Sequence, residues 1–491
     1  MFYTLLIKNL NKNVAKTRQR ERSAKSVELK AELSQKDKAF LEQSLNGPMW
    51  KVLLKIGTPL AFYQMLSQIF TILDTMMAAH ISEESVSAVA YLAQLNSILS
   101  AVGGGLAVGA GIQISRAYGK GNLTMVRQRV SSLYALCFFV GAAMLAVILP
   151  FTNSFLHLAG TPDSLIAVGS QYFIVQLFVM VVTFLNNVYI AVERARGNAN
   201  RIFWLNLLVI GTKLSLTALF VYILNSGLVM IAVASLASQL VLFVFALRNS
   251  IFGTSAFTFS LKAVTIQRTV VAPMVENSVP VIVEKALFAF GKTIVNAMCT
   301  AYGALMVGAM GVSNNLGGIT TNPQNGYQEG AAAIISQNFG AGKYRRVLEA
   351  FASILVIDVA VGAVISGVEM WQMDALAKLF DSGNTQFHSM ITLVYRYEAL
   401  GAVPLGINAA VMALLYGLGK TRLTLILNVA RVFLFRIPVF WFLQHCTTLG
   451  EASVGVVMMV SNISVTVMAV VVAVIVLRDF RRTYGLPFFR A

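Results

Sequence analysis

Long apolar runs separated by short polar segments recur from residue 50 to residue 477. A helix needs about 20 mainly apolar residues to cross the hydrocarbon core of a bilayer, and on that measure the pattern predicts twelve membrane-spanning helices. The first 45 residues are polar and rich in Lys and Arg, with no apolar core typical of a signal peptide. We expect a helix only around "KDKAFLEQSL" in this arm and disorder elsewhere. The predicted spans are 52–79, 86–117, 130–151, 164–191, 202–224, 228–248, 271–302, 304–337, 347–370, 387–416, 423–443 and 451–477.

Composition agrees with an all-α polytopic membrane protein. Of the 491 residues 57% are hydrophobic and 12% are charged, and the mean hydropathy is +0.71. The formal charge of +17 does not indicate nucleic-acid binding, because most Lys and Arg lie in the short segments between apolar runs. These segments alternate between basic and nearly charge-free, with Lys378 as the exception. The positive-inside rule then places both termini in the cytoplasm, and we expect a multi-pass protein of the cell membrane.

The sequence gives no sign of a metal centre, a cofactor or a catalytic cluster. Its three cysteines, Cys137, Cys299 and Cys446, fall in or beside different apolar runs without metal-ligand spacing. Its four histidines all lie near predicted outer loops. We therefore expect no cofactor, no metal and no enzyme activity.

The two halves of the chain repeat one another. "SRAYGKGN" from Ser115 matches "SQNFGAGK" from Ser336, and "GNANRIFWLN" from Gly197 matches "GKTRLTLILN" from Gly419. The separation in sequence between Pro59 and Pro280 equals the separation between these matched stretches to within one residue. Each half holds six spans, an even number, so both insert with the same orientation, and the repeat is parallel, about an axis along the membrane normal.

A parallel repeat predicts two six-helix lobes around a central cleft, which could give alternating access by rocking against each other. The predicted parts are a basic cytoplasmic arm (1–50), an N-terminal lobe (51–248), a cytoplasmic linker (249–270), a C-terminal lobe (271–477) and a cytoplasmic tail (478–491).

Five stretches resemble the multidrug and toxic compound extrusion (MATE) family, in the family's order. They are "NGPMWKVLLKIGTPLAF", the "LDT" within the first span, "SRAYGKGN", "SQNFGAGKYRR" and "GLGKTRLTLILNVARVFLFRIPVF". The resemblance covers roughly residues 45–480. It implies a secondary antiporter that exports a small organic molecule, such as a drug or other xenobiotic, in exchange for protons or sodium ions.

The first span carries polar residues at spacings of three and four, which places them on one helical face. Such a face lines a cavity or forms hydrogen bonds between helices. Asp74 matches the family's first-helix aspartate, which implies a coupling role in the N-terminal lobe; a structural ion pair is the alternative. The stripe consists of Tyr63, Gln64, Ser67, Gln68, Thr71, Asp74 and Thr75.

The fifth span departs from the family pattern. In DinF-like members an Asn and an Asp there surround the first-helix aspartate, and those positions fall on Lys213 and Thr217 in this chain. Lys213 could pair with Asp74 and take the place of a sodium ion, either permanently or as a switch during transport. The resemblance is closer to the DinF-like than to the NorM-like pattern, and proton coupling is favoured over sodium coupling.

Glu284 in the seventh span aligns with the glutamate that NorM-like members use to bind cations. The second acid of that pattern is absent, because its position falls near Leu405. Glu284 is therefore a coupling candidate, and a structural pairing with a neighbour or with Arg436 is the alternative.

The predicted spans hold more positive than negative charges. The cations are Lys213, Lys285, Lys292, Arg431 and Arg436, and the acids are mainly Asp74 and Glu284. Charged side chains inside a membrane form pairs or line water-filled cavities. A cationic cleft favours an anionic or zwitterionic substrate. Thr217, Lys292, Arg431 and Asn296, the repeat counterpart of Asp74, complete the candidate cleft residues.

Three functions remain open from the sequence. The leading one is a MATE-type exporter, whose partners are a small-molecule substrate, H+ or Na+, and the bilayer, with no nucleic acid and no second subunit. The alternative is a flippase for lipids or lipid-linked precursors in the same superfamily. A receptor or channel is disfavoured because we find no filter motif and no large soluble domain.

Overall fold

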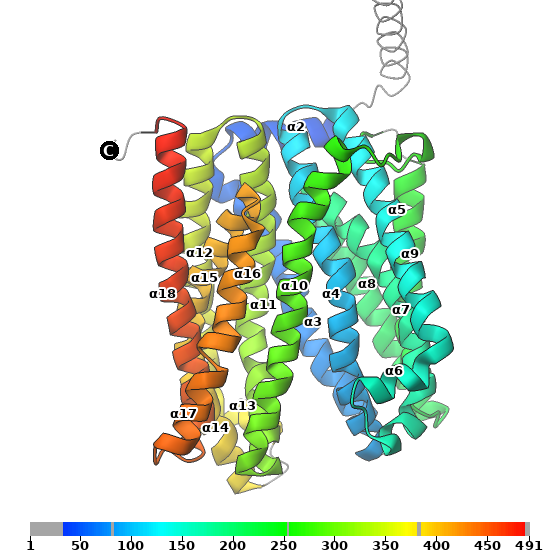
Figure 1. The fold of residues 1–491 in the computed structure, drawn as a ribbon, viewed down its shortest axis with the longest axis vertical. Coiled ribbons are helices and arrows are strands. Elements are labelled where there is room, and N and C mark those ends of the chain that lie inside the picture. The colour runs from blue at the N-terminus through cyan, green and yellow to red at the C-terminus, as the bar shows by residue number, and fades with distance from the viewer. Residues whose placement is uncertain (1–32, 80–82, 253–254, 381–383, 487–491) are drawn as a thin grey trace, which may run out of the picture.

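The computed structural model describes residues 33–79, 83–252, 255–380 and 384–486, which fold into long helices lying side by side (Figure 1). Each predicted span coincides with one long helix or one broken helix. In chain order these are α3 (Met49–Ala79), α4 (Glu83–Gly119), α5 (Leu123–Ile148), α7 (Asp163–Ala195), α8 (Ala199–Ala218), α9 (Val229–Ile251), α10 (Arg268–Cys299), α11 (Ala304–Gly340), α12 (Tyr344–Trp371), the pair α14 (Thr385–Leu400) and α15 (Ala402–Leu418), the pair α16 (Thr421–Val429) and α17 (Ile437–Cys446), and α18 (Ala452–Thr483).

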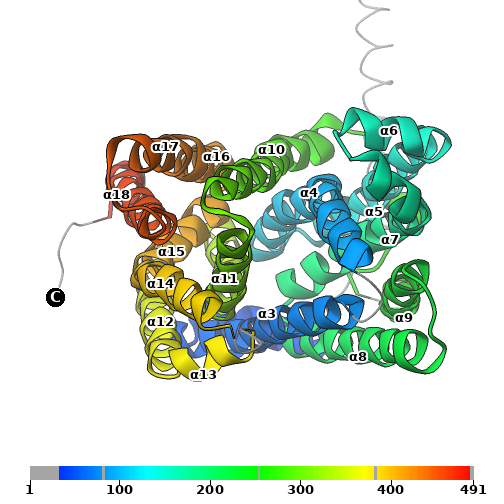
Figure 2. The same cartoon turned by 90° about the horizontal axis from the view of Figure 1, so that it is seen from below.

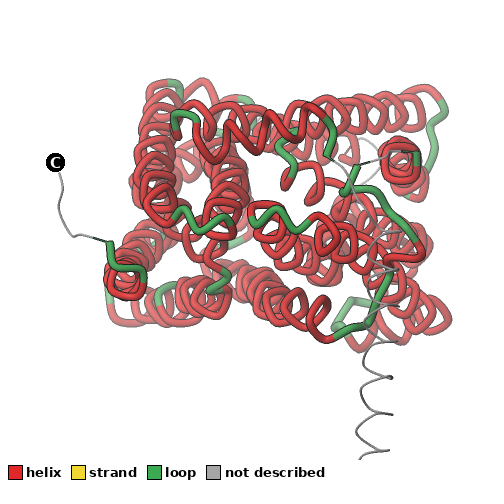
Figure 3. Tube along the Cα trace, turned by 90° about the horizontal axis from the view of Figure 1, so that it is seen from above, coloured by secondary structure: helices red, strands yellow, loops and turns green. Residues whose placement is uncertain are grey.

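Shorter elements join or extend these helices. They are α2 (Gln35–Asn46), α6 (Thr152–Leu158) and α13 (Met373–Lys378), the 3-10 turns η1 (Leu149–Phe151), η3 (Leu261–Ala263) and η4 (Thr300–Tyr302), and the π-helical segments η2 (Leu219–Ile223) and η5 (Ala430–Leu434). Viewed from the end where α2 lies, the connections between helices are short, except the one that leads from α9 through η3 to α10 (Figure 3). We call this end, which also holds the C-terminal end of α18, the α2 end (Figure 1).

Length and apolar composition support membrane insertion. Within the described residues eight helical segments are long and apolar enough to cross a bilayer, and the bent pair α14–α15 makes up to nine. The other predicted spans form α3, α10 and α11, which are 31, 32 and 37 residues long. Of these three helices, α3 packs against α11, and α10 packs against α4.

Two helices are broken in ways that matter for the site. The chain bends by 45° between α14 and α15, at Gly401, where an added Cβ would lie 2.6 Å from Asn462 Nδ2 of α18. Between α16 and α17 the helix widens into the π-helical η5, which contains Arg431. Such π-helical turns often occur at functional sites.

The helices form two groups, α3–α9 and α10–α18, which meet through α3, α4, α10 and α11 (Figure 2). The pair α3–α11 and the pair α4–α10 make the most extensive contacts between the groups. The internal repeat relates α3 to α10 and α4 to α11, so these two contacts are equivalent, as expected for a parallel repeat. This is the all-α, two-lobed architecture that the sequence predicts.

Small residues let the lobes approach closely. A Cβ on Gly109 of α4 would lie 2.5 Å from the Ser278 backbone of α10. At the equivalent position, a Cβ on Gly330 of α11 would lie 3.6 Å from Gly57 Cα of α3. Backbone contact of this kind is how helices pack in membranes, where the hydrophobic effect does not drive association.

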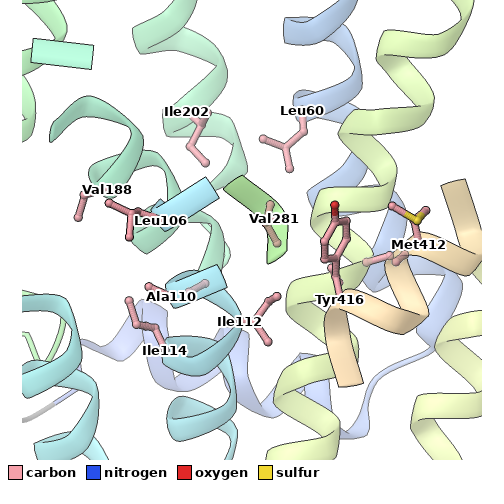
Figure 4. Packing of buried hydrophobic residues seen from close by; sticks show 14 of the residues in the cluster. Leu60, Leu106, Ala110, Ile112, Ile114, Val188, Ile202, Val281, Met412 and Tyr416 are labelled. Atoms are coloured by element: carbon pink, nitrogen blue, oxygen red, sulfur yellow. The ribbon is translucent and has the colours of Figure 1, made fainter. Parts of the chain in front are cut away.

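A continuous apolar core underlies this interface. Leu106 and Ala110 of α4, Val281 of α10, and Met412 and Tyr416 of α15 belong to one buried cluster that extends across both lobes (Figure 4). By contrast, many large apolar side chains, such as the 80% exposed Trp371, lie on the outside. Exposed apolar surface on this scale is expected where lipid surrounds a protein.

The expected helix of the N-terminal arm is confirmed as α2, and it connects both lobes. Asp37 is buried, and its carboxylate accepts hydrogen bonds from Nε and Nη2 of Arg196 in the N-terminal lobe, both at 3.0 Å. Ser44 donates to Gln337 of α11 at 2.6 Å, and its carbonyl accepts from Arg346 at 3.1 Å. α2 therefore joins the two lobes at the α2 end.

Candidate substrate cavity and coupling site

A polar cavity of about 260 Å³ lies between α3, α10, α11, α14, α15 and the η5 region. Its wall comes mainly from the C-terminal lobe, and Gln68 contributes from α3 of the other lobe. Gln68 Nε2 donates to Asn315 Oδ1 at 3.2 Å, and Asn322 Nδ2 donates to Gln68 Oε1 at 2.9 Å. The cavity thus borders the lobe interface, where a change in lobe packing would alter it.

Three cations border this cavity. Lys292 comes from α10, Arg431 from η5, and Arg436 from the N-terminal end of α17. Arg431 Nη2 and Arg436 Nη2 both donate to Asn462 Oδ1, at 2.8 and 3.2 Å. These bonds to a neutral amide fix the two guanidinium groups without compensating their charge.

A single carboxylate, that of Glu398 on α14, is among the residues that line the same cavity. Ser313 of α11 donates to Glu398 Oε2 at 2.5 Å. A Cβ on Gly317 would lie 2.7 Å from Glu398 Oε1, so this glycine leaves the space that the carboxylate occupies. With three cations and one carboxylate, the cavity wall carries a net positive charge.

Side-chain amides complete the wall and make the cavity suited to polar ligands. Gln324 Nε2 donates a hydrogen bond to the Ala402 carbonyl at 3.0 Å, next to the α14–α15 bend. Asn408 of α15 is 6% exposed, and its Oδ1 has no hydrogen-bond donor among the described residues. A buried acceptor without a donor is costly, and because Asn408 lines the cavity, a ligand could supply the missing donor.

Glu284 occupies a separate buried position. Its carboxylate accepts hydrogen bonds from Tyr416 Oη at 2.7 Å, Thr424 Oγ1 at 2.7 Å and Asn428 Nδ2 at 2.6 Å. The pairing with Arg436 that the sequence allowed is not found, because Arg436 Nε donates instead to Ser461 of α18 at 3.0 Å. Glu284 therefore has a complete hydrogen-bond environment of neutral donors.

A smaller cavity of about 60 Å³ near Tyr416 lies between the lobes and includes an ion pair. Arg194 of α7 and Glu329 of α11 approach to 2.5 Å, with side chains 15% and 23% exposed. This pair joins the N-terminal to the C-terminal lobe. Arg194 belongs to the basic segment that follows the predicted span 164–191, and the sequence did not identify Glu329 as its partner.

The structure brings together only part of the candidate set. Lys292, Arg431 and Gln68 meet at the cavity. Lys213 lies half-buried on α8, and Thr217 is buried there without a hydrogen-bond partner for its hydroxyl among the described residues. The half-buried Tyr63, Gln64, Ser67 and Asn296 do not belong to the cavity wall as described.

The side chains of Asp74, Thr71 and Thr75 lie outside the described residues. The proposed pairing of Asp74 with Lys213 therefore stays a prediction.

The expectation that Asp74 and Glu284 are the main acids inside the spans is wrong. Glu329 of α11, Asp358 and Glu369 of α12, and Glu398 of α14 also lie within predicted spans. Asp358 is fully buried, and neither of its carboxylate oxygens has a donor among the described residues. An acid inside an apolar run was the signal that should have marked these four residues.

Comparisons with known proteins agree with this architecture. The family model described as MatE matches residues 59–219 and 280–442, one segment in each lobe. The probable multidrug resistance protein YoeA of Bacillus subtilis (strain 168) is 21% identical over 425 residues, covering 83% of this chain and 90% of that protein. The multidrug export protein MepA of Staphylococcus aureus (strain MSSA476) is 22% identical over 307 residues, covering 61% of this chain and 66% of that protein.

Solved structures share the fold at low sequence identity. A MATE crystal structure in complex with MaL6 covers 90% of this chain and 99% of its own, with a TM-score of 0.86 and 18% identity. An outward-facing multidrug resistance MATE family transporter of the MOP superfamily covers 92% and 99%, with a TM-score of 0.85 and 18% identity. Because the family model matches both lobes over most of their length, the chain belongs to the MATE family of membrane transporters, which are not enzymes.

Proposed function

We propose that this protein is a secondary active antiporter that exports a small organic anion or zwitterion in exchange for protons, with sodium ions as the less favoured coupling ion. It acts as a monomer in the cell membrane, with the α2 end and both termini in the cytoplasm. The observation that carries the proposal is the polar, net positive cavity at the lobe interface, lined by Lys292, Arg431, Arg436 and Glu398. The flippase alternative is not favoured, because the relatives' names describe multidrug export and resistance.

Glu284 is the proposed proton-binding group of the C-terminal lobe. Its carboxylate is buried and bonded by neutral donors, so it can change charge without breaking an ion pair. The Tyr416 donor also borders the small interlobe cavity, which links Glu284 to the lobe contact. Asp74 and Lys213 remain the proposed coupling pair of the N-terminal lobe, and they and Leu405 support the DinF-like assignment.

Alternating access would proceed by rocking of the two lobes. The α3–α11 and α4–α10 contacts are close and built on small residues, so each lobe can pivot as a packed unit. Arg194–Glu329 and the α2 contacts hold the α2 end together in the present state. Opening that end to the cytoplasm would require these interactions to separate.

Transport by purified protein in proteoliposomes tests this function. Efflux of carboxyfluorescein, an anion, and ethidium, a cation, is followed under a proton gradient alone, a sodium gradient alone, and neither gradient. We expect the proton gradient to accelerate carboxyfluorescein efflux and the Glu284→Gln variant to lose that acceleration. Efflux of ethidium alone would contradict the anionic or zwitterionic substrate class, and efflux that follows only the sodium gradient would contradict proton coupling.

A further inference from the structure

The residues that line the 260 Å³ cavity include two chemically different groups, which we call its poles. The first consists of Lys292, Arg431 and Arg436. In the described part of the chain none of these three side chains forms an ion pair with a carboxylate, and Lys292 makes no hydrogen bond. The guanidinium groups are instead oriented by Asn462 and Ser461 of α18. This pole presents positive charge that a bound anionic group would satisfy.

The second pole accepts hydrogen bonds and positive charge. Glu398 accepts one hydrogen bond, from Ser313, at Oε2. An ammonium group offers three donors, which suits a carboxylate that has one donor of its own. Gly317 keeps Glu398 in this position, because any larger side chain would meet its Oε1.

We infer that the cavity binds a zwitterion, with its anionic group at Lys292, Arg431 and Arg436 and its ammonium group at Glu398, and that Glu398 determines this specificity. The inference deepens the proposed function and rests on it for the direction of transport. The ligand class is a small molecule that carries one carboxylate or phosphate and one primary amine.

Proton exchange follows from the same geometry. A proton on Glu398 removes the charge that holds the ligand ammonium, so proton and substrate compete for this carboxylate. The charged groups that interact with Glu398 are Lys292, Arg431 and Arg436 from the cavity wall and Glu369 from α12, with Tyr395 of α14 beside them.

Three probes of equal chain length test the inference: 5-aminopentanoate, pentanoate and pentylamine. Their binding to the purified full-length protein is measured by calorimetry at about pH 7.5, where carboxylate and ammonium groups are both charged. We expect 5-aminopentanoate to bind best. In Glu398→Gln its affinity falls roughly ten- to hundredfold, the value of a hydrogen bond to a charged group, while pentanoate binding is retained or strengthened.

The pH dependence of binding gives a second readout, which would not change if Glu398 had only a structural role. Acidification weakens 5-aminopentanoate binding to the unmodified protein and leaves the residual binding to Glu398→Gln unchanged. Glu276→Gln is the matched control, because it removes an exposed acid of α10 outside the cavity and should behave like the unmodified protein.

Preferential binding of pentylamine, equal binding of all three probes, binding of none, or unchanged selectivity in Glu398→Gln would each overturn the inference. These measurements need no transport. Zwitterion binding without proton-driven efflux would therefore refute the antiporter function and leave the ligand class standing.

Discussion

Glu284 and Glu398 show how two carboxylates in one lobe acquire different roles. Glu284 is 4% exposed and accepts three hydrogen bonds from neutral donors of α15 and α16. Glu398 accepts one from Ser313 and borders a cavity with three cations. The first environment suits a group that holds a proton, and the second suits a group that touches substrate.

Replacing Glu284 separates its charge from its hydrogen bonds. Glu284→Gln keeps one acceptor oxygen, which can serve Tyr416 and Asn428 as Oε1 does now, so the fold should persist while proton-driven efflux is lost. Glu284→Ala leaves Tyr416 and Asn428 without this acceptor, whereas Thr424 can still donate to the Thr421 carbonyl. It should cost about 1–3 kcal/mol for each donor left unsatisfied. Thermal unfolding in detergent and efflux from proteoliposomes measure the two effects. Full proton-driven efflux in Glu284→Gln would exclude Glu284 from coupling.

At the scale of helices, the close contacts between α4 and α10 depend on glycine at particular positions. Gly109 faces the Ser278 backbone at a virtual Cβ distance of 2.5 Å, whereas a Cβ on Gly104 of the same helix would meet no heavy atom within 4 Å. The two positions therefore separate the effect of helix packing from the effect of side-chain size.

Gly109→Val should force α4 away from α10 and destabilise the protein by about 1–3 kcal/mol, as overpacking does. Gly104→Val on the same helix should be tolerated. Unfolding temperature and efflux are measured for both variants. Equal behaviour of the two would contradict a close α4–α10 contact in the working protein.

A second prediction at the scale of helices concerns the contacts of α2. Asp37→Ala removes one of the two carboxylate partners of Arg196, which keeps Glu193 at 3.1 Å. It leaves the Arg196 Nε and Nη2 donors without their acceptor and should cost about 1–3 kcal/mol. Glu42→Ala on the exposed face of α2 is the matched control and should have little effect. The free energy of unfolding, from denaturant titration, distinguishes them; a stability equal to that of the control would show that α2 does not hold the lobes together.

The helices were predictable and the cavity was predictable only in part. Apolar runs place each helix because every spanning segment must satisfy its own backbone hydrogen bonds. The bend at Gly401 was not predicted, although Gly401 and Pro404 are local signals for a helix break. The contact with Asn462, which comes from a distant helix, was not predictable from this segment. Lys292 and Arg431 were singled out as charges inside spans, but their meeting with Glu398 depends on how α10, α14 and η5 pack, which periodicity does not encode.

At the scale of the whole molecule, the equivalent contacts α3–α11 and α4–α10 make the two lobes separable units around one interface. The cavity lies at this interface, and the Arg194–Glu329 pair and α2 join the lobes at the α2 end. A rocking motion would exchange these contacts for new ones at the opposite end, giving the cavity access to each side in turn.

The Arg194–Glu329 pair allows a charge-swap test. Arg194→Glu and Glu329→Arg alone each place like charges at a contact of 2.5 Å and should weaken closure of the α2 end. The double variant restores an opposite pair and should recover efflux. Reactivity of a cysteine at Ser115, which borders the same small cavity, reports opening; failure of the double variant to recover protection would argue against a direct lock.

The most direct test of the central claim, rocking of the two lobes, is to measure the distance between the lobes at each end of the molecule. Cys137, Cys299 and Cys446 are replaced by alanine, and spin labels are placed at Lys120 and Arg345 near the α2 end, or at Leu158 and Leu379 near the opposite end; all four sites are exposed. Electron–electron distances are then compared between neutral and acidic pH. Rocking exchange predicts that one distance lengthens while the other shortens. Distances that both stay constant, or that change in the same direction, would contradict it.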